Sequence, residues 1–256
     1  MRYAPADPLL ADGDGDNIPD LALGRLTVRT LAEAEEAVRK ILDYDTQPAS
    51  GQFLLAAGQQ DSNAPQAFAV ASEAFSADLP PSWSTDRVYQ DQLGLGAARQ
   101  ALVSAFNNGR SVVSYIGHSG PTRWTFDPLL DISQVLGSSS NPALPNLLPN
   151  TNQPIVLQFA CWTTYFVSPT QNTMAQALLL SPGRGASAVL GATVLMEQSS
   201  HERIAGALAR QLSPGVRIGD ALLAAKAELA GDAQNPVGPD ILLGQILLGD
   251  PAQQIR

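Results

Sequence analysis

Short apolar runs alternate with helical patterns along this chain, and that alternation constrains its fold more than any other feature. The clearest runs are 53–57, 111–116 and 154–159; the second is rich in β-branched residues and ends at Gly117, which is typical of a buried strand entering a tight loop. Helical patterns precede and follow them. This order favours a mostly parallel sheet with helices on both faces. We therefore expect an α/β fold.

The helical patterns have recognisable boundaries. Thr30 and Glu33 form a capping box, and the apolar stripe after them predicts a helix to about Tyr44. Other helices are expected at 65–77, 96–107, 174–180, 200–212 and 218–229, with short strands at 21–25, 88–89, 186–191 and 246–248. The 256 residues are 45% hydrophobic and 15% charged, which is enough to bury a sizeable core, and we expect one domain.

Two chemically reactive side chains follow two of the apolar runs. His118 comes after the 111–116 run, and Cys161 comes after the 154–159 run. Binding sites in open α/β sheets lie outside the carboxyl ends of the strands, so both side chains are expected to face one cleft. The polar stretch 124–152 is interpreted as a surface excursion that lets the two strands be neighbours.

The pair also suits nucleophilic chemistry. The chain has one cysteine and two histidines, so few other pairs of nucleophile and base are possible. A thiol needs a nearby imidazole to become a reactive thiolate at neutral pH, and His118 is the candidate. Backbone N–H groups of the turn at Gly117–Gly120 and of Cys161 are candidates for stabilising an oxyanion. Taken alone, Cys161 is more simply interpreted as a buried core thiol, and His118 as a histidine in a turn.

Five stretches occur in an order that resembles a known family. They are Asp14–Arg25 (DGDNIPDLALGR), Tyr115–Gly120 (YIGHSG), Gln158–Cys161 (QFAC), Ile218–Lys226 (IGDALLAAK) and Leu248–Pro251 (LGDP). Together they resemble the gingipain-type cysteine peptidases of the caspase-like clan. The resemblance spans nearly the whole chain, residues 1–256.

The resemblance implies a fold and an activity. The fold would be a caspase-like three-layer sandwich, and the activity that of an endopeptidase in which Cys161 and His118 form the dyad. Such an enzyme cleaves protein or peptide substrates through a thioester and requires no cofactor. It would be exported or attached to a bacterial cell surface. Family catalytic domains generally have more chain before the acidic loop, so we expect this domain to lack its N-terminal portion. The alternative is a catalytically inactive caspase-like module with a binding or structural role in export or surface assembly.

One position departs from the family pattern. The usual His-Gly is His118-Ser119 here. If the position requires a positive φ to aim its amide at the oxyanion, serine carries a strain that glycine would not. Either activity is weakened, or Gly120 takes over the role.

Other residues near the pair allow several interpretations. Asp61, after the 53–57 run, is a candidate to orient His118, to line a specificity pocket, or to cap the next helix. His201 stands in a polar first turn, which predicts a solvated residue without a function. Three aromatic residues either wall the cleft or pack in the core: Trp124, Trp162 and Tyr165.

The acidic loop has spacing typical of calcium ligands. Asp12, Asp14, Asp16 and Asp20 stand at its first, third, fifth and ninth positions, and Ile18 offers a carbonyl. Position six is asparagine and position twelve is leucine, so the loop is not an EF-hand. A structural Ca²⁺ and an acidic solvated turn remain equally open.

Charge and composition exclude several classes of function. The net charge of −9 and the absence of a Lys/Arg cluster argue against nucleic acid as a partner. The sequence has no uninterrupted apolar stretch long enough to cross a bilayer. A single cysteine rules out an internal disulfide and any zinc site built from several cysteines.

Overall fold

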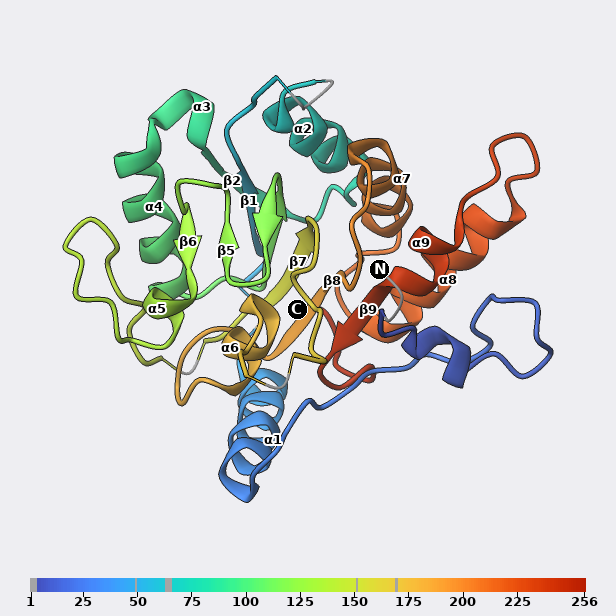
Figure 1. Ribbon diagram of the computed structural model, residues 1–256, viewed down its shortest axis with the longest axis horizontal. Helices are drawn as coiled ribbons and strands as arrows, with labels where there is room; N and C mark the ends of the chain where they lie inside the picture. Colours follow the sequence, from blue (N-terminus) through green and yellow to red (C-terminus); the bar gives the residue numbers. More distant parts are fainter. Residues whose placement is uncertain (1–3, 49, 63–65, 151, 169) are drawn as a thin grey trace.

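A six-stranded sheet forms the centre of the molecule (Figure 1). The computed structural model describes residues 4–48, 50–62, 66–150, 152–168 and 170–256. Across the sheet the strands are β2 (Ser84–Tyr89), β1 (Gln52–Ala57), β3 (Val112–Ile116), β7 (Ile155–Phe159), β8 (Ala188–Ala192) and β9 (Gln245–Leu248). All neighbours pair in parallel except β8 and β9, which are antiparallel. The predicted mostly parallel sheet is confirmed.

Helices cover both faces of this sheet and make three layers (Figure 1). One face packs against α2 (Phe68–Asp78), α7 (Gln198–Ala209) and α8 (Ile218–Gly231). The other packs against α1 (Leu31–Thr46), α4 (Leu95–Asn107), α5 (Ile132–Val135) and α6 (Met174–Leu180). Successive strand residues point to opposite faces of the sheet and so belong to two different hydrophobic cores, as Phe53 and Leu54 do. Because the central strands are buried on both sides, they are continuous apolar runs in the sequence.

Helix α1 begins at the predicted capping box. Thr30 Oγ1 accepts the Glu33 N–H, and the Glu33 carboxylate accepts the Thr30 N–H in return. Farther along, the fully buried Lys40 donates to the carbonyl oxygens of Leu178 and Arg184, at 2.9 and 2.5 Å. Burial lowers the pKa of Lys40 to about 7. Lys40 therefore joins α1 to the end of α6.

The stretch between the two central strands contains a second, small sheet. It consists of β4 (Ser119–Gly120), β5 (Arg123–Trp124) and β6 (Leu130–Asp131). As expected, β3 and β7 are direct neighbours, with Val113 opposite Val156. The excursion is nevertheless partly buried. The Trp124 ring stacks on Tyr115 at 4.3 Å between centroids, which makes it core and corrects its interpretation as a wall of the cleft.

Several elements differ from their predicted extent. The 21–25 strand is reduced to a single bridge between Arg25 and Leu248. Helix α2 begins at Phe68, and part of the predicted start at 65 lies outside the described residues. Four short helices were not predicted: η1 (Asp7–Leu10), α3 (Gln90–Leu93), α5 (Ile132–Val135) and α9 (Pro239–Gly244).

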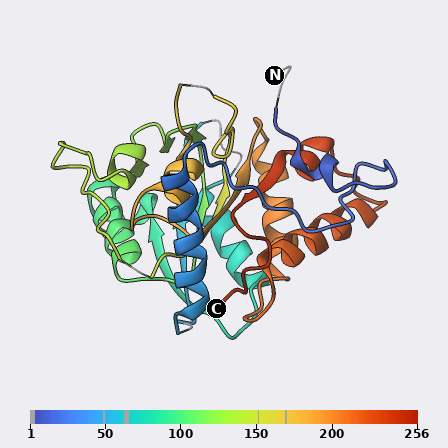
Figure 2. The ribbon, with the colours of Figure 1, turned by 90° about the horizontal axis from the view of Figure 1, so that it is seen from below.

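The two ends of the described chain lie on opposite sides of the molecule in Figure 2. Figure 2 shows the N-terminal segment running from η1, beside α8 and α9, to α1. The C-terminus lies beside the end of α1, where the Arg256 N–H donates to the Tyr44 hydroxyl at 3.3 Å. In the part of the chain that the structure describes, every helix is too short or too polar to cross a bilayer.

Candidate active site

His118 stands just beyond the carboxyl end of β3. Its Nε2 lies 3.3 Å from the Asp61 carboxylate, and both side chains are about a third exposed. The ring is held between Phe68, at 5.1 Å edge to face, and Phe126, at 5.6 Å. The Tyr115 hydroxyl also donates to the His118 carbonyl oxygen at 2.6 Å. The imidazole is therefore fixed from several sides while one edge still reaches solvent.

Gly117 explains how the chain reaches His118 from the strand. A Cβ at this position would collide with the Tyr115 hydroxyl. Only glycine lets the backbone pass this close to that hydroxyl. The Gly-His order thus reflects packing beneath the histidine.

Asp61 contacts the ring of His118 rather than a helix end. Helix α2 begins seven residues later, at Phe68, and its N-cap residue Ala67 makes no side-chain cap. The helix-cap interpretation of Asp61 is therefore wrong. The contact with His118 fits the other expectation, an acidic partner for the imidazole.

Cys161 follows β7 on a tight turn. Trp162, directly after it, has a φ of 57°, in the left-handed region that few residues other than glycine adopt, and its N–H donates to the Val194 carbonyl at 3.2 Å. The thiol sulfur donates to the Met196 carbonyl oxygen at 3.4 Å and accepts from the Met196 N–H at 3.5 Å. Burial raises the pKa of the Cys161 thiol, and the Met196 N–H acts in the opposite direction.

His118 and Cys161 line one cavity of about 500 Å³ at the carboxyl edge of the sheet. Its other walls come from the end of β7, the start of α2 and the segment that leads into α7. That segment contributes Leu195, which is largely exposed, and Glu197, also exposed. The cavity is of a size that holds a ligand side chain or a short peptide segment.

Ser119 and Gly120 form the short strand β4 beside this cavity. Neither residue has a positive φ. The strain anticipated for serine therefore does not arise. Instead, the Ser119 hydroxyl donates a 2.5 Å hydrogen bond to the Cys161 carbonyl oxygen.

His201 contradicts its prediction as a solvated residue. It is 4% exposed in the first turns of α7, and its Nε2 lies 3.9 Å from the Cys161 sulfur. The polar residues next to His201 in the sequence gave no indication of its burial. The helical spacing of His201 with Ile204, Ala205 and Leu208 places it on the buried stripe, and that spacing was the available signal.

The acidic loop brings together three of its four carboxylates. Ligand oxygens of Asp12, Asp14 and Asp20 all lie within 4.8 Å of one another. Asp16 is outside this group and accepts the Ile18 N–H at 2.7 Å. Backbone N–H groups of the loop also donate to Asp12 and Asp20, which shapes the turn.

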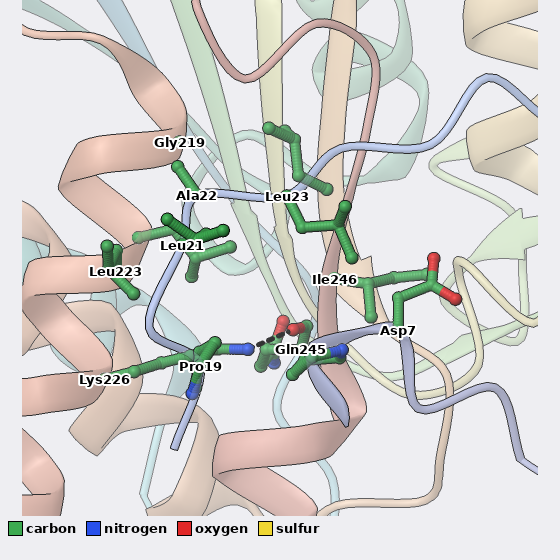
Figure 3. A pocket seen from close by; sticks show the side chains of 13 residues that line it. Asp7, Pro19, Leu21, Ala22, Leu23, Gly219, Leu223, Lys226, Gln245 and Ile246 are labelled. Atoms are coloured by element: carbon green, nitrogen blue, oxygen red, sulfur yellow. Dashed lines mark hydrogen bonds between the residues drawn. The ribbon is translucent and has the colours of Figure 1, made fainter. Parts of the chain in front are cut away.

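A second cavity, of about 20 Å³, lies between η1, α8 and the start of β9 (Figure 3). Its walls are mainly apolar, and the 2% exposed Lys226 reaches across it to donate to the Gln245 carbonyl oxygen at 2.8 Å. Burial lowers the pKa of Lys226 to about 7. The space fits about one water molecule, so it is not a substrate site.

Comparisons with known proteins agree with this geometry. The family model for peptidase family C25 matches residues 2–256. Two solved structures share the fold: the Arg-specific cysteine proteinase gingipain R (TM-score 0.81, 16% identity) and the complex of Porphyromonas gingivalis RgpB pro- and mature domains (TM-score 0.79, 17% identity). A third, described only as a protease, has a TM-score of 0.72 and 20% identity.

This chain spans only part of the length of the solved structures that it matches. The alignments cover 97% to 100% of this chain but only 59% to 60% of those chains. No curated protein matches the chain. The likeness to the solved structures bears out the expected caspase-like three-layer fold, and the match to the family model extends over almost every residue. The chain therefore belongs to peptidase family C25, the family of the gingipains.

Proposed function

We propose that this domain is a cysteine endopeptidase whose nucleophile is Cys161 and whose acid and base is His118. The observation that carries the proposal is their shared cavity: two adjacent parallel strands place the only thiol of the chain and a partly exposed imidazole in one cleft. Membership of a peptidase family supports the same chemistry.

The reaction needs no cofactor. His118 takes the proton of the Cys161 thiol, the thiolate attacks the scissile carbonyl carbon, and His118 returns the proton to the leaving amine. Water then attacks the thioester, His118 accepts its proton, and the carboxylic acid product leaves as the thiol reforms. Because Nε2 faces Asp61, Nδ1 is the nitrogen we assign to these transfers.

Asp61 is proposed as the third member of this group. A carboxylate 3.3 Å from Nε2 fixes the tautomer with a proton on Nε2 and stabilises the imidazolium that forms during the reaction. Its position on a loop after β1, the strand next to β3, supports this role.

Backbone amides next to the dyad are proposed to stabilise the oxyanion. The candidates are those of Cys161 and of the turn that contains Ser119 and Gly120. Such donors contribute because they are already oriented before charge develops. The hydrogen bond from Ser119 to the Cys161 carbonyl supports the proposal, since it ties the two loops together.

Family analogy extends to partners and location. We infer a protein or peptide substrate and an extracellular or cell-surface site of action, since gingipain-type peptidases act there. The arginine specificity of gingipain R is not transferred to this chain. Nucleic acid is not proposed as a partner because the net charge is −9.

A structural Ca²⁺ is proposed at the acidic loop, apart from the catalytic chemistry. Three carboxylates within 4.8 Å provide the hard oxygen ligands that Ca²⁺ prefers. Like charges this close repel one another, and a divalent cation would neutralise them.

Peptide cleavage by the wild-type protein and by Cys161→Ala tests the proposed activity. The full chain is incubated with a mixed peptide library under reducing conditions, and products are identified by mass spectrometry. Cleavage that disappears in Cys161→Ala supports the peptidase. Equal inactivity of the two folded proteins would favour the alternative, an inactive module with a binding or structural role in export or surface assembly.

A further inference from the structure

A second histidine contacts the Cys161 sulfur from the protein interior. His201 Nε2 lies 3.9 Å from Sγ, and the ring is almost fully buried in the first turns of α7. His118, in contrast, is partly exposed and lines the open cavity. The sulfur therefore has two imidazoles in its surroundings, with different access to water.

The other nitrogen of His201 has a partner that determines where its proton lies. Gln245 Nε2 is 3.5 Å from His201 Nδ1, and an amide NH₂ group can only donate. With Gln245 Nε2 as the donor, Nδ1 accepts and the proton of the neutral ring is on Nε2. That proton points toward the sulfur.

Gln245 is itself held in place from behind. Lys226 donates to its backbone carbonyl oxygen at 2.8 Å, as Figure 3 shows. Gln245 begins strand β9 and is paired with Ala192, at the carboxyl end of β8. A buried chain of contacts thus runs from Lys226 through Gln245 and His201 to the sulfur.

We propose that His201 is a positioning residue for Cys161, donating its Nε2–H to the thiolate from the buried side of the cleft. This role rests on Cys161 being the nucleophile. Together with the Met196 N–H, at 3.5 Å, His201 would give the sulfur two donors. Hydrogen bonds to a thiolate favour the charged form and fix the direction in which its lone pair points.

His201 does not compete with His118 as the base. Burial keeps its ring neutral throughout the neutral pH range, because it lowers the pKa of His201 to about 3. A neutral ring with Nδ1 occupied by Gln245 cannot accept the thiol proton at Nε2, which already carries one. Its contribution is a fixed donor.

The Met196 carbonyl oxygen, 3.4 Å from the sulfur, accepts from the thiol and opposes the thiolate, and Gln198 and Ser199 are polar residues of the same cavity. His118 and Glu197 line the same cavity from β3 and from the segment before α7. The buried Tyr115 hydroxyl lies behind His118 and is occupied by the His118 carbonyl. Any pH profile of the thiol contains contributions from these groups, so variants must be compared with the wild type.

Alkylation of the thiol measures the proposed effect directly. Cys161 is the only cysteine, so iodoacetamide labelling of the full chain reports on it alone. Replacing His201 with methionine removes the donor at similar size, whereas glutamine places an amide N–H near the same point. We expect His201→Met to move the midpoint of the pH–rate profile up by about 1, with alkylation at pH 7 about 3- to 10-fold slower. We expect His201→Gln to stay within about threefold of the wild-type rate at pH 7.

The same experiment can overturn the proposal. It fails if the His201→Met profile overlays that of the wild type, or if His201→Gln shifts as far as His201→Met. Because alkylation needs no peptide substrate, it separates this result from the test of peptidase activity. If no peptide is cleaved but the pH–rate profile of alkylation shifts in His201→Met, the result contradicts the proposed peptidase activity and not the role of His201.

The tautomer can also be read in the wild-type protein, should His201→Met fail to fold. ¹⁵N-histidine labelling gives two ring systems, and a His118→Ala sample assigns them. The proposal requires that His201 be neutral with its proton on Nε2. A neutral ring protonated on Nδ1 would overturn it.

Discussion

The Ser119 hydroxyl donates a 2.5 Å hydrogen bond to the Cys161 carbonyl oxygen and so joins the loop after β3 to the loop after β7. The two loops carry the two proposed catalytic side chains. Serine at this position, where the family pattern has glycine, therefore has a structural use. It fixes the spacing of the loops without requiring a positive φ.

Replacing Ser119 should loosen this connection. For Ser119→Gly we expect a loss of about 1–2 kcal/mol in the free energy of unfolding, from the hydrogen bond and from added backbone freedom. Ser119→Ala should lose only the hydrogen-bond part. If the loop spacing matters for catalysis, kcat/KM falls about fivefold to tenfold in both. Urea unfolding and peptide cleavage check these values, and a Ser119→Gly protein that is as stable and active as the wild type would contradict them.

Asp61→Asn should slow the chemical step because an amide cannot stabilise the imidazolium of His118. We expect kcat to fall about 10- to 100-fold with little change in KM, since Asp61 is proposed to act through the histidine. Asp127→Asn provides a matched control: it makes the same charge change at an exposed residue next to Phe126. If both variants lose activity equally, the effect is one of overall charge and Asp61 has no specific role.

The central part of the fold could be predicted from the sequence because β3 and β7 are buried on both faces. Their apolar runs and the residues that follow them were therefore visible. Strand β2 is an edge strand whose first residues are mainly exposed, so only Val88 and Tyr89 gave a signal. Short helices such as α9 carry too few residues to show a period.

The site was predicted in part for similar reasons. Strand ends placed His118 and Cys161 on one edge, and parallel pairing brought them to one cavity. The interaction of Asp61 with His118 depends on a loop whose path no local pattern determines. The burial of His201 was not predicted because its neighbours in sequence are polar, although its neighbours in space are Cys161 and Gln245.

His201 also predicts how stability depends on pH. Burial lowers its pKa to about 3 in the folded protein from an ordinary value of 6.5, so the unfolded chain binds the proton first on acidification. The stability associated with the neutral ring is complete above pH 6.5 and is lost as the pH falls toward 3. By pH 4 the loss is up to about 3 kcal/mol.

Comparison with His201→Gln isolates this contribution, because the acidic side chains are common to both proteins. Urea unfolding at pH 7 and pH 4 gives the two free energies for each protein. We expect the wild type to lose more stability than His201→Gln over this interval. Parallel losses would show that His201 is not buried in its neutral form.

Calcium should stabilise the domain through Asp12, Asp14 and Asp20. Excess Ca²⁺ that binds only the folded state raises the melting temperature, by an amount that corresponds to about 2.7 kcal/mol at 100 times its dissociation constant. A chelator should reverse the increase. Asp14→Asn should abolish most of it, whereas Asp16→Asn should retain it, because Asp16 lies outside the group of carboxylates. Melting temperatures that do not respond to Ca²⁺ or chelator would leave the loop as a solvated acidic turn, held by its own backbone hydrogen bonds to Asp12 and Asp20.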